Sequence, residues 1–318
     1  MSKRAGRVTF GLDVCLGLGI FPAGRHSGLR SAYIQFNGVG VSECTLGNKH
    51  SSNGTGNMIY EICTLTDPGL TRDNNEDAIA VDALTGLCIL ADGMGGYNAG
   101  EVASGMAAAF IKSEMARWLA QTGMNSNARE MRRALEICVE NANHSIFNAA
   151  NSNPQYRGMG TTLVMGVFQG NRVTLGHIGD SRCYRVRSDS LQQLTKDHSL
   201  LQEQLDAGLI SVEDAQTSLN RNLVTRALGV EEIVMVEINE FRVEIGDCYL
   251  LCSDGLTDMV NDADIATIFL GSGSLEQKAA RLVQQANDNG GRDNISVVLA
   301  HAREGAVKRG VLSRILGN

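Results

Sequence analysis

Residues 87–96 read LCILADGMGG, an unbroken apolar run that stops at Asp92 and is followed by three glycines within four positions. A short apolar run bounded by turn residues is typical of a strand that is buried on both faces. Asp-Gly pairs end strands because glycine tolerates the backbone angles that turns require. We therefore predict a buried strand whose end presents the Asp92 carboxylate at the rim of a sheet.

Four more aspartates stand beside turn residues where other apolar segments begin or end. They are Asp77 in RDNNED, Asp180 in IGDS, Asp254 in LLCSDG and Asp293 in GGRDN. Strand ends that meet at one rim would bring these carboxylates together, where they would repel one another. Mg²⁺ and Mn²⁺ prefer oxygen ligands and would remove this repulsion. No histidine or cysteine spacing typical of zinc occurs, so the pattern favours a Mg²⁺ or Mn²⁺ site.

Hydrophobic periodicity outside this motif predicts helices and strands in separate groups. Apolar residues at three- and four-residue steps indicate helices over 101–119, 131–149 and 275–286. Strands are predicted over 162–169, 172–178, 183–187, 234–245, 248–252 and 295–301. Hairpin spacing without regular strand–helix–strand alternation indicates antiparallel sheets covered by segregated helices, which is an α+β layered fold.

The chain divides into two unlike parts near Met58. Residues 1–57 hold 11 of the 36 glycines, show no sustained hydrophobic period and end in GNKHSSNGTGN. We expect residues 1–57 to be a disordered or non-native extension, with the functional chain beginning near Met58. Residues 58–302 should form one domain with a polar surface flap at 197–226, and residues 303–318 a short tail.

Composition excludes several classes of protein. The net charge is −7, and residues 1–57 carry +4, so the rest of the chain carries −11. An acidic body argues against nucleic-acid binding, which needs a basic surface. No apolar run reaches the ~18 residues of a membrane span. Eight cysteines without a CxxC pair indicate buried thiols in a reducing compartment, which predicts a cytoplasmic protein. We also expect a monomer, with no nucleic-acid or membrane partner.

Nine motifs occur together between Met58 and Ala302, and their order is informative. They are RxxNED, ADGMGG, GEVAS, GMGTT, GDSR, TKDHS, VTRALG, SDGLTD and GGRDN. In this combination the chain resembles the metal-dependent Ser/Thr protein phosphatases of the type 2C (PPM) family, in its compact bacterial form. The resemblance implies a four-layer αββα sandwich, in which helices flank two antiparallel sheets and a binuclear metal site lies at one rim.

The resemblance also implies a set of metal ligands. Asp92 would bridge two Mn²⁺ or Mg²⁺ ions, and the carbonyl of Gly93 would bind one of them. Asp254 and Asp293 would complete the ligands of the other ion. Asp180 and Asp254 match the positions that hold a weaker third ion in bacterial members.

Catalytic residues follow from the same motifs. Glu76 and Asp77 would act on metal-bound waters, either directly or through one water, and Asp77 would also belong to the metal site. Arg72 would bind the substrate phosphate, and Asn294 would accompany the metal aspartate. A water between the two ions would attack the phosphorus in line while the ions and the guanidinium neutralise the oxygens. The implied reaction is hydrolysis of phosphoserine and phosphothreonine in proteins. The enzyme would oppose a bacterial Ser/Thr kinase, and its partners would be that kinase and the proteins that the kinase phosphorylates.

One position departs from part of the family, and two alternatives stay open. Some members carry histidine after the bridging Asp-Gly, where this chain has Met94, which cannot donate a proton. We expect a metal-bound water oriented by Glu76 or Asp77 to protonate the leaving group, with His198 as a second candidate. The alternatives are a metal-binding scaffold of the same fold without catalysis, and a phosphatase dedicated to one signalling protein.

Overall fold

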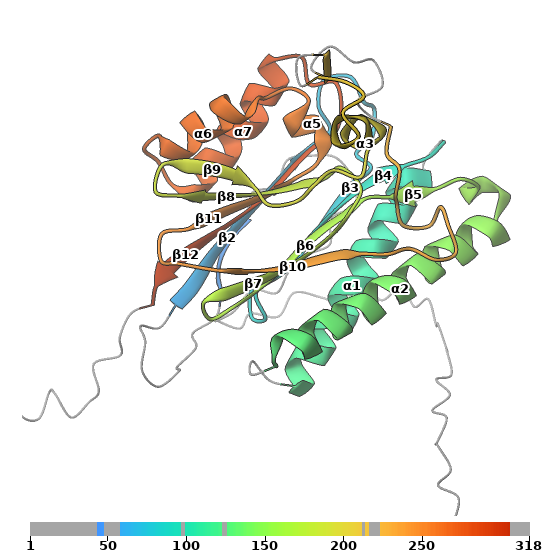
Figure 1. Ribbon diagram of the computed structural model, residues 1–318, viewed down its shortest axis with the longest axis horizontal. Helices are drawn as coiled ribbons and strands as arrows, with labels where there is room; N and C mark the ends of the chain where they lie inside the picture. The colour runs from blue at the N-terminus through green and yellow to red at the C-terminus, as the bar shows by residue number, and fades with distance from the viewer. Residues whose placement is uncertain are drawn as a thin grey trace, which may run out of the picture. The chain divides into compact units, whose positions relative to one another are not determined.

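The computed structural model describes residues 43–47, 58–96, 99–122, 126–211, 214–215 and 223–305 (Figure 1). All of these residues belong to the compact unit Ala32–Asn318, and the other unit, Met1–Ser31, contains none of the described residues. Most of the expected extension and most of the expected tail are therefore not described. Within the extension, residues Glu43–Gly47 form a strand that the sequence did not predict. This strand pairs with the strand Met58–Asp67. The domain boundary at Met58 stays a prediction.

Two antiparallel sheets form the centre of the described chain (Figure 1). The first sheet has the strand order β1-β2-β12-β11-β8-β9 and the second has the order β10-β7-β6-β4-β3. The first contains β1 (Glu43–Gly47), β2 (Met58–Asp67), β8 (Arg182–Arg187), β9 (Ser190–Gln193), β11 (Cys248–Cys252) and β12 (Ile295–Glu304). The second contains β3 (Asp77–Asp82), β4 (Leu87–Met94), β6 (Leu163–Gln169), β7 (Arg172–Ile178) and β10 (Glu237–Arg242), and the short β5 (Gly160–Thr161) pairs with β4.

Helices cover the outer face of each sheet. Helices α1 (Ala99–Thr122) and α2 (Ala128–Ser152) share a hydrophobic core with the second sheet. Helices α5 (Asp254–Thr257), α6 (Asp262–Leu270) and α7 (Leu275–Asp288) share another core with the first sheet. A third core lies between the two sheets, so the order of layers is helix, sheet, sheet, helix (Figure 1). The predicted four-layer αββα fold is confirmed.

Strand β4 shows why its sequence is apolar on both faces. Leu87, Ile89 and Ala91 lie in the core shared with α1 and α2. Cys88 and Leu90 lie in the core between the sheets. Because successive side chains of a strand point to opposite faces, a strand between two apolar layers needs the continuous run that the sequence contains. The run ends where β4 reaches the rim, at Asp92.

Several elements differ from the predictions. Strand β10 is shorter than the predicted 234–245 at both ends. At its C-terminal end the chain turns back, and the Asp247 carboxylate accepts the backbone N–H of Glu244. Strand β9, the α3 helix (Leu200–Asp206), α5 and α6 were not predicted. Each is four to nine residues long, which is too short for a hydrophobic period to stand out.

The described residues also bear on the compartment and membrane expectations. Cys63, Cys88, Cys138, Cys183, Cys248 and Cys252 are all buried. None of the helices formed by the described residues is long and apolar enough to cross a bilayer.

The core between the sheets gives a stability prediction. Phe168 is fully buried, with its ring centroid 5.1 Å from that of Tyr60 and 5.2 Å from that of Tyr249. Phe168→Ala should lower the free energy of unfolding by about 3–5 kcal/mol in urea titrations, because a cavity replaces the ring. Phe168→Leu should cost clearly less. Equal and small losses for both variants would contradict this account of the core.

Candidate metal centre and active site

The rim of the two sheets gathers the five aspartates that the sequence singled out. Asp77 begins β3 and lies directly opposite Asp92, the sixth residue of β4, across the antiparallel pair. Asp180 follows the end of β7, Asp254 follows the end of β11, and Asp293 precedes the start of β12. Asp92 interacts electrostatically with the other four. The structure therefore brings together residues that are up to 216 positions apart in the chain.

The electrostatics of this rim are dominated by buried carboxylates that repel one another. Burial and the neighbouring aspartates raise the pKa of Asp92 and of Asp254 well above the ordinary value. Burial raises the pKa of Asp77 to about 7 and that of Asp180 to about 6. The Oδ1 atom of Asp77 is buried without a hydrogen-bond partner, whereas Oδ2 accepts from the hydroxyl of Ser253 at 2.9 Å. Hard oxygen donors with an unpartnered, buried oxygen fit Mg²⁺ or Mn²⁺.

Glycine at position 93 allows the backbone around Asp92 to pack closely. The Gly93 N–H donates to the Glu76 carbonyl at 3.1 Å. A Cβ atom at Gly93 would lie 2.2 Å from the carbonyl oxygen of Gly100, in the first turn of α1, and 2.6 Å from that of Glu76. No other residue fits this position, so the end of β4 stays pressed against the loop that carries Glu76.

The side chain of Asn294 forms hydrogen bonds with the loop that precedes β3. Its Oδ1 accepts the backbone N–H of Glu76 at 2.7 Å, and its Nδ2 donates to the carbonyls of Asn74 and Pro68 at 2.8 and 3.0 Å. Burial raises the pKa of the Glu76 carboxyl. The side-chain amide is thus committed to backbone groups, and its visible effect is to place Glu76 beside the aspartates.

Arg72 lies on the same loop and points to the rim. Its Nη2 donates to Oδ2 of Asp293 at 2.7 Å, and the side chain is half exposed. The hydrogen bond with Asp293 raises the pKa of the guanidinium, which therefore stays charged. An exposed cation anchored beside a cluster of anions is suited to receive the oxygens of a phosphate.

Two hydroxyl side chains connect Asp92 to the loop that carries Asp180. The backbone N–H of Asp92 donates to Thr162 Oγ1 at 3.1 Å, and the Thr162 N–H donates to the Asp92 carbonyl at 2.9 Å. The same hydroxyl lies 2.8 Å from that of Ser181. Thr162, which lies between β5 and β6, is therefore placed beside the site.

Sequence reasoning missed two acidic residues around Asp180. Asp258 lies four positions after Asp254, one helical turn on, and its charge raises the pKa of both Asp180 and Asp254. The motif SDGLTD contained this signal. Asp197 also raises the pKa of Asp180 and is itself held by Arg182 through bonds of 2.7–3.0 Å. No local pattern links Asp197 to Asp180.

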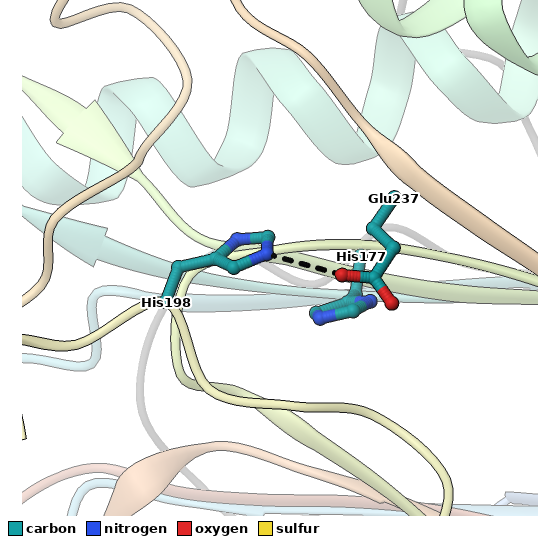
Figure 2. A group of neighbouring side chains, drawn as sticks. All are labelled: His177, His198 and Glu237. Carbon is teal, nitrogen blue, oxygen red and sulfur yellow. Dashed lines mark ion pairs between the residues drawn. The ribbon is translucent and has the colours of Figure 1, made fainter. Parts of the chain in front are cut away.

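The structure also places the two residues considered for proton donation to the leaving group. Met94 ends β4. His198 is buried, and its Nδ1 accepts the backbone N–H of Gly179 at 3.2 Å. Its other ring nitrogen faces Glu237, 3.5 Å from Oε2 (Figure 2). A buried imidazole with both nitrogens directed at protein groups is a poor proton donor to a bound substrate, so the second candidate is disfavoured.

Comparison with known proteins identifies the family. A family model described as protein phosphatase 2C matches residues 71–300. The chain belongs to the protein phosphatase 2C family. Among its relatives, the serine/threonine phosphatase stp of Listeria innocua is 40% identical over 237 residues, covering 74% of this chain and 92% of that protein. Protein phosphatase PhpP of Streptococcus pneumoniae is 37% identical over 247 residues, covering 77% of this chain and 98% of that protein.

Solved structures agree with this family assignment. The catalytic domain of the serine/threonine phosphatase PstP, in complex with two manganese ions, has a TM-score of 0.68 at 36% identity, covering 77% of this chain and 99% of that one. Serine/threonine phosphatase Stp1 from Staphylococcus aureus has a TM-score of 0.72 at 33% identity, covering 80% and 98%. The family, the fold and the enzyme class predicted from the sequence, a phosphoprotein phosphatase, are confirmed.

Proposed function

We propose that this protein phosphatase 2C member hydrolyses phosphoserine and phosphothreonine in proteins, using two Mn²⁺ or Mg²⁺ ions held by the rim carboxylates. Asp92 would contact both ions, the Gly93 carbonyl would bind one, and Asp254 and Asp293 would bind the other. The observation that carries the proposal is the cluster of buried, mutually repelling aspartates with the unpartnered Asp77 Oδ1. When bound, the two ions would activate a water and neutralise the phosphoryl oxygens. Asp180 with Asp254 would hold a weaker third ion.

The names of the relatives support the substrate class. Stp and PstP are named as serine/threonine phosphatases, and one PstP structure holds two manganese ions. The metal-dependent serine/threonine class and the two-ion site predicted from the sequence agree with these findings.

Residues of this chain handle substrate and protons around the metal site. Arg72 binds the phosphate oxygens, because a planar guanidinium meets two of them at once. Asn294 places Glu76 through its hydrogen bond to the Glu76 N–H. Asp77, with a pKa of about 7 before metal binds, and Glu76 orient the water that protonates the leaving serine or threonine oxygen. Met94 takes no part in that proton transfer.

Arg72 offers a test with a matched control. Arg72→Ala should raise the KM for p-nitrophenyl phosphate and lower kcat/KM about 10–100-fold, because a charge-assisted bond to the phosphate is lost. Arg72→Lys should recover only part of this loss. Arg303, near the end of β12 and away from the rim, is about as exposed as Arg72. It also pairs with a carboxylate, that of Glu61, at 2.6 Å. Arg303→Ala should leave KM unchanged, and an equal rise in KM for both alanine variants would contradict a phosphate contact.

Turnover separates the phosphatase from the scaffold alternative. The full chain with Mn²⁺ should release phosphate from phosphoserine and phosphothreonine peptides, and chelation of the metal should stop the reaction. Calorimetric Mn²⁺ binding without turnover on any phosphopeptide would favour a scaffold that has lost catalysis.

Partners and compartment are further parts of the proposal. We propose that the enzyme is cytoplasmic and monomeric. It opposes a Ser/Thr kinase by dephosphorylating the proteins that the kinase phosphorylates. The burial of the cysteines of the described chain is consistent with a reducing compartment. Phosphoproteomics of a deletion strain should show many sites with raised phosphorylation, whereas a single changed site would favour a phosphatase dedicated to one signalling protein.

We also propose that residues 58–302 carry the activity. Strand β1 pairs with β2 at the edge of the first sheet, where a chain beginning at Met58 would lack it. Phosphatase activity of that shorter chain should equal that of the full chain, because every proposed site residue lies after Met58.

A further inference from the structure

His177, His198 and Glu237 form a polar cluster next to the loop that carries Asp180 (Figure 2). His177 is the sixth residue of β7 and lies directly opposite Glu237, the first residue of β10. His198 comes from the segment that leads into α3. The two imidazole rings stack with their centroids 4.7 Å apart and their planes at 18°. Both histidines are almost fully buried, whereas the Glu237 side chain is 42% exposed.

Backbone groups determine which ring nitrogens carry protons. The Gly179 N–H donates to Nδ1 of His198, so this nitrogen holds a lone pair and the ring proton lies on Nε2, toward Glu237. The Lys196 carbonyl lies 2.9 Å from Nε2 of His177 and can only accept, so that nitrogen carries the proton. Burial, the neighbouring His177 and Arg226 lower the pKa of His198, which favours the neutral ring.

These contacts argue against a metal ion in the cluster. One ligand atom from each residue lies within 4.8 Å of the others, and two histidines with a glutamate are a common zinc ligand set. However, the only lone pair of neutral His198 is already used by Gly179. The nearly parallel rings also direct their in-plane lone pairs away from a common point. His198 is therefore better suited to holding the Gly179 N–H than to binding a metal ion.

The bonds of His198 join two functional segments. Its backbone N–H donates to the Gly179 carbonyl at 2.9 Å, so ring and backbone together grip Gly179 on both sides. Its carbonyl accepts the Thr225 N–H at 2.8 Å, and a bridge between Ser199 and Val224 follows. These contacts close the base of the predicted flap, where its two strands of chain meet.

Gly179 is a position where a small displacement would matter. Its φ is +102°, and a Cβ atom there would lie 2.7 Å from the Thr162 side chain. Thr162 in turn bonds to the Asp92 backbone and to Ser181. The residue that follows Gly179 is Asp180. The backbone gripped by His198 thus lies between the flap base and two of the proposed metal ligands.

We infer that His198 is a positioning residue of the phosphatase: its Nδ1 holds the Gly179 N–H, and so fixes Asp180 at the rim and couples the flap base to the metal site. This inference rests on the proposed function, because it assigns Asp180 to metal binding. His177 packs against the ring, and Glu237 faces its Nε2–H.

A series of substitutions at His198 tests which ring nitrogen matters. Asparagine places its amide oxygen close to the position of Nδ1, and glutamine extends toward Nε2. His198→Asn should keep kcat within about 3-fold of the wild type, whereas His198→Gln and His198→Leu should raise the Mn²⁺ concentration needed for half-maximal activity by about 10–100-fold. Their KM for p-nitrophenyl phosphate should change less than kcat at low Mn²⁺. His144→Asn, the same change on α2, should have no effect.

Two further measurements do not depend on activity. NMR of the histidine nitrogens should show His198 with its proton on Nε2, and amide hydrogen exchange at Gly179 and Thr225 should be faster in the leucine and glutamine variants than in the asparagine variant. If the wild type hydrolyses no phosphopeptide, the proposed function fails, while these measurements still test the positioning role.

Three outcomes would overturn the inference. The first is an asparagine variant as impaired as the leucine variant at an equal melting temperature. The second is wild-type behaviour in all three variants. The third is stoichiometric Zn²⁺ binding that His177→Ala abolishes, which would make the cluster a metal site.

Discussion

Replacement of Asp92 by asparagine is expected to abolish Mn²⁺-dependent phosphatase activity and, in the same protein, to raise the melting temperature of the metal-free state. Asp92 lies among four other aspartates, and burial with their charges raises its pKa well above the ordinary value. The neutral amide removes part of this repulsion, so the metal-free fold should gain several degrees in thermal scans. It also removes the carboxylate proposed to contact both ions, so activity should fall by about 10³-fold or more.

A second aspartate serves as the control for this experiment. Asp189 lies exposed in the turn between β8 and β9, with a φ of 65° that asparagine also adopts readily. Asp189→Asn should change neither activity nor melting temperature. If Asp92→Asn lowered the melting temperature of the metal-free protein, the carboxylate would be stabilising the fold, and the account of a strained acidic cluster would be wrong.

The stability of the metal-free protein is expected to fall as pH rises from about 4 to about 7. An unfolded aspartate releases its proton near pH 4, whereas the folded protein keeps those of Asp77 and Asp180 up to about pH 7 and 6. Within this window the folded state binds more protons than the unfolded state, so the free energy of unfolding decreases with increasing pH. Urea denaturation in the presence of a chelator, at pH 5 and pH 8, measures the effect.

Mn²⁺ should reverse this pH dependence. Metal binding requires deprotonated carboxylates, so it should release protons and become weaker as pH falls from 8 to 6. Saturating Mn²⁺ at about 100 times its Kd should add roughly 2.7 kcal/mol at pH 8 and much less at pH 5.5. Calorimetry in buffers of different ionisation enthalpy counts the protons released. Mn²⁺ binding that released none at pH 6 would show that the raised pKa values do not belong to the metal ligands.

The convergence of the aspartates at one rim was predictable because several of them have local signatures. Asp92 and Asp254 each follow a buried apolar strand and precede glycine, and such strand ends are recognisable without knowledge of the fold. The long helices were predictable for a similar reason, since each repeats its apolar residues over several turns. The five aspartates converge as expected.

Other parts of the site depend on contacts between distant segments. Asn294 holds the N–H of Glu76 across 218 positions of the chain, and its role in placing that loop follows only from the fold. His198 has no local sign of its bond to Gly179, and its residue type alone suggested a proton donor. Strand β9 forms because it pairs with β8, and helix α5 because Gly255 and Leu256 are buried. A hydrophobic period cannot reveal them.

The pairing of β2 with β12 has a consequence for the topology of the chain. The two strands run antiparallel over ten residues, from Ile295 opposite Asp67 near the metal rim to Glu304 opposite Met58 at the far end. At about 3.4 Å per residue, the far end lies roughly 31 Å along the sheet from the rim. A short linker joining Glu304 to Met58 would therefore close the domain into a ring remote from the chemistry. New termini could then be opened in an exposed turn, such as that at Asp189, to give a circularly permuted phosphatase with its site intact.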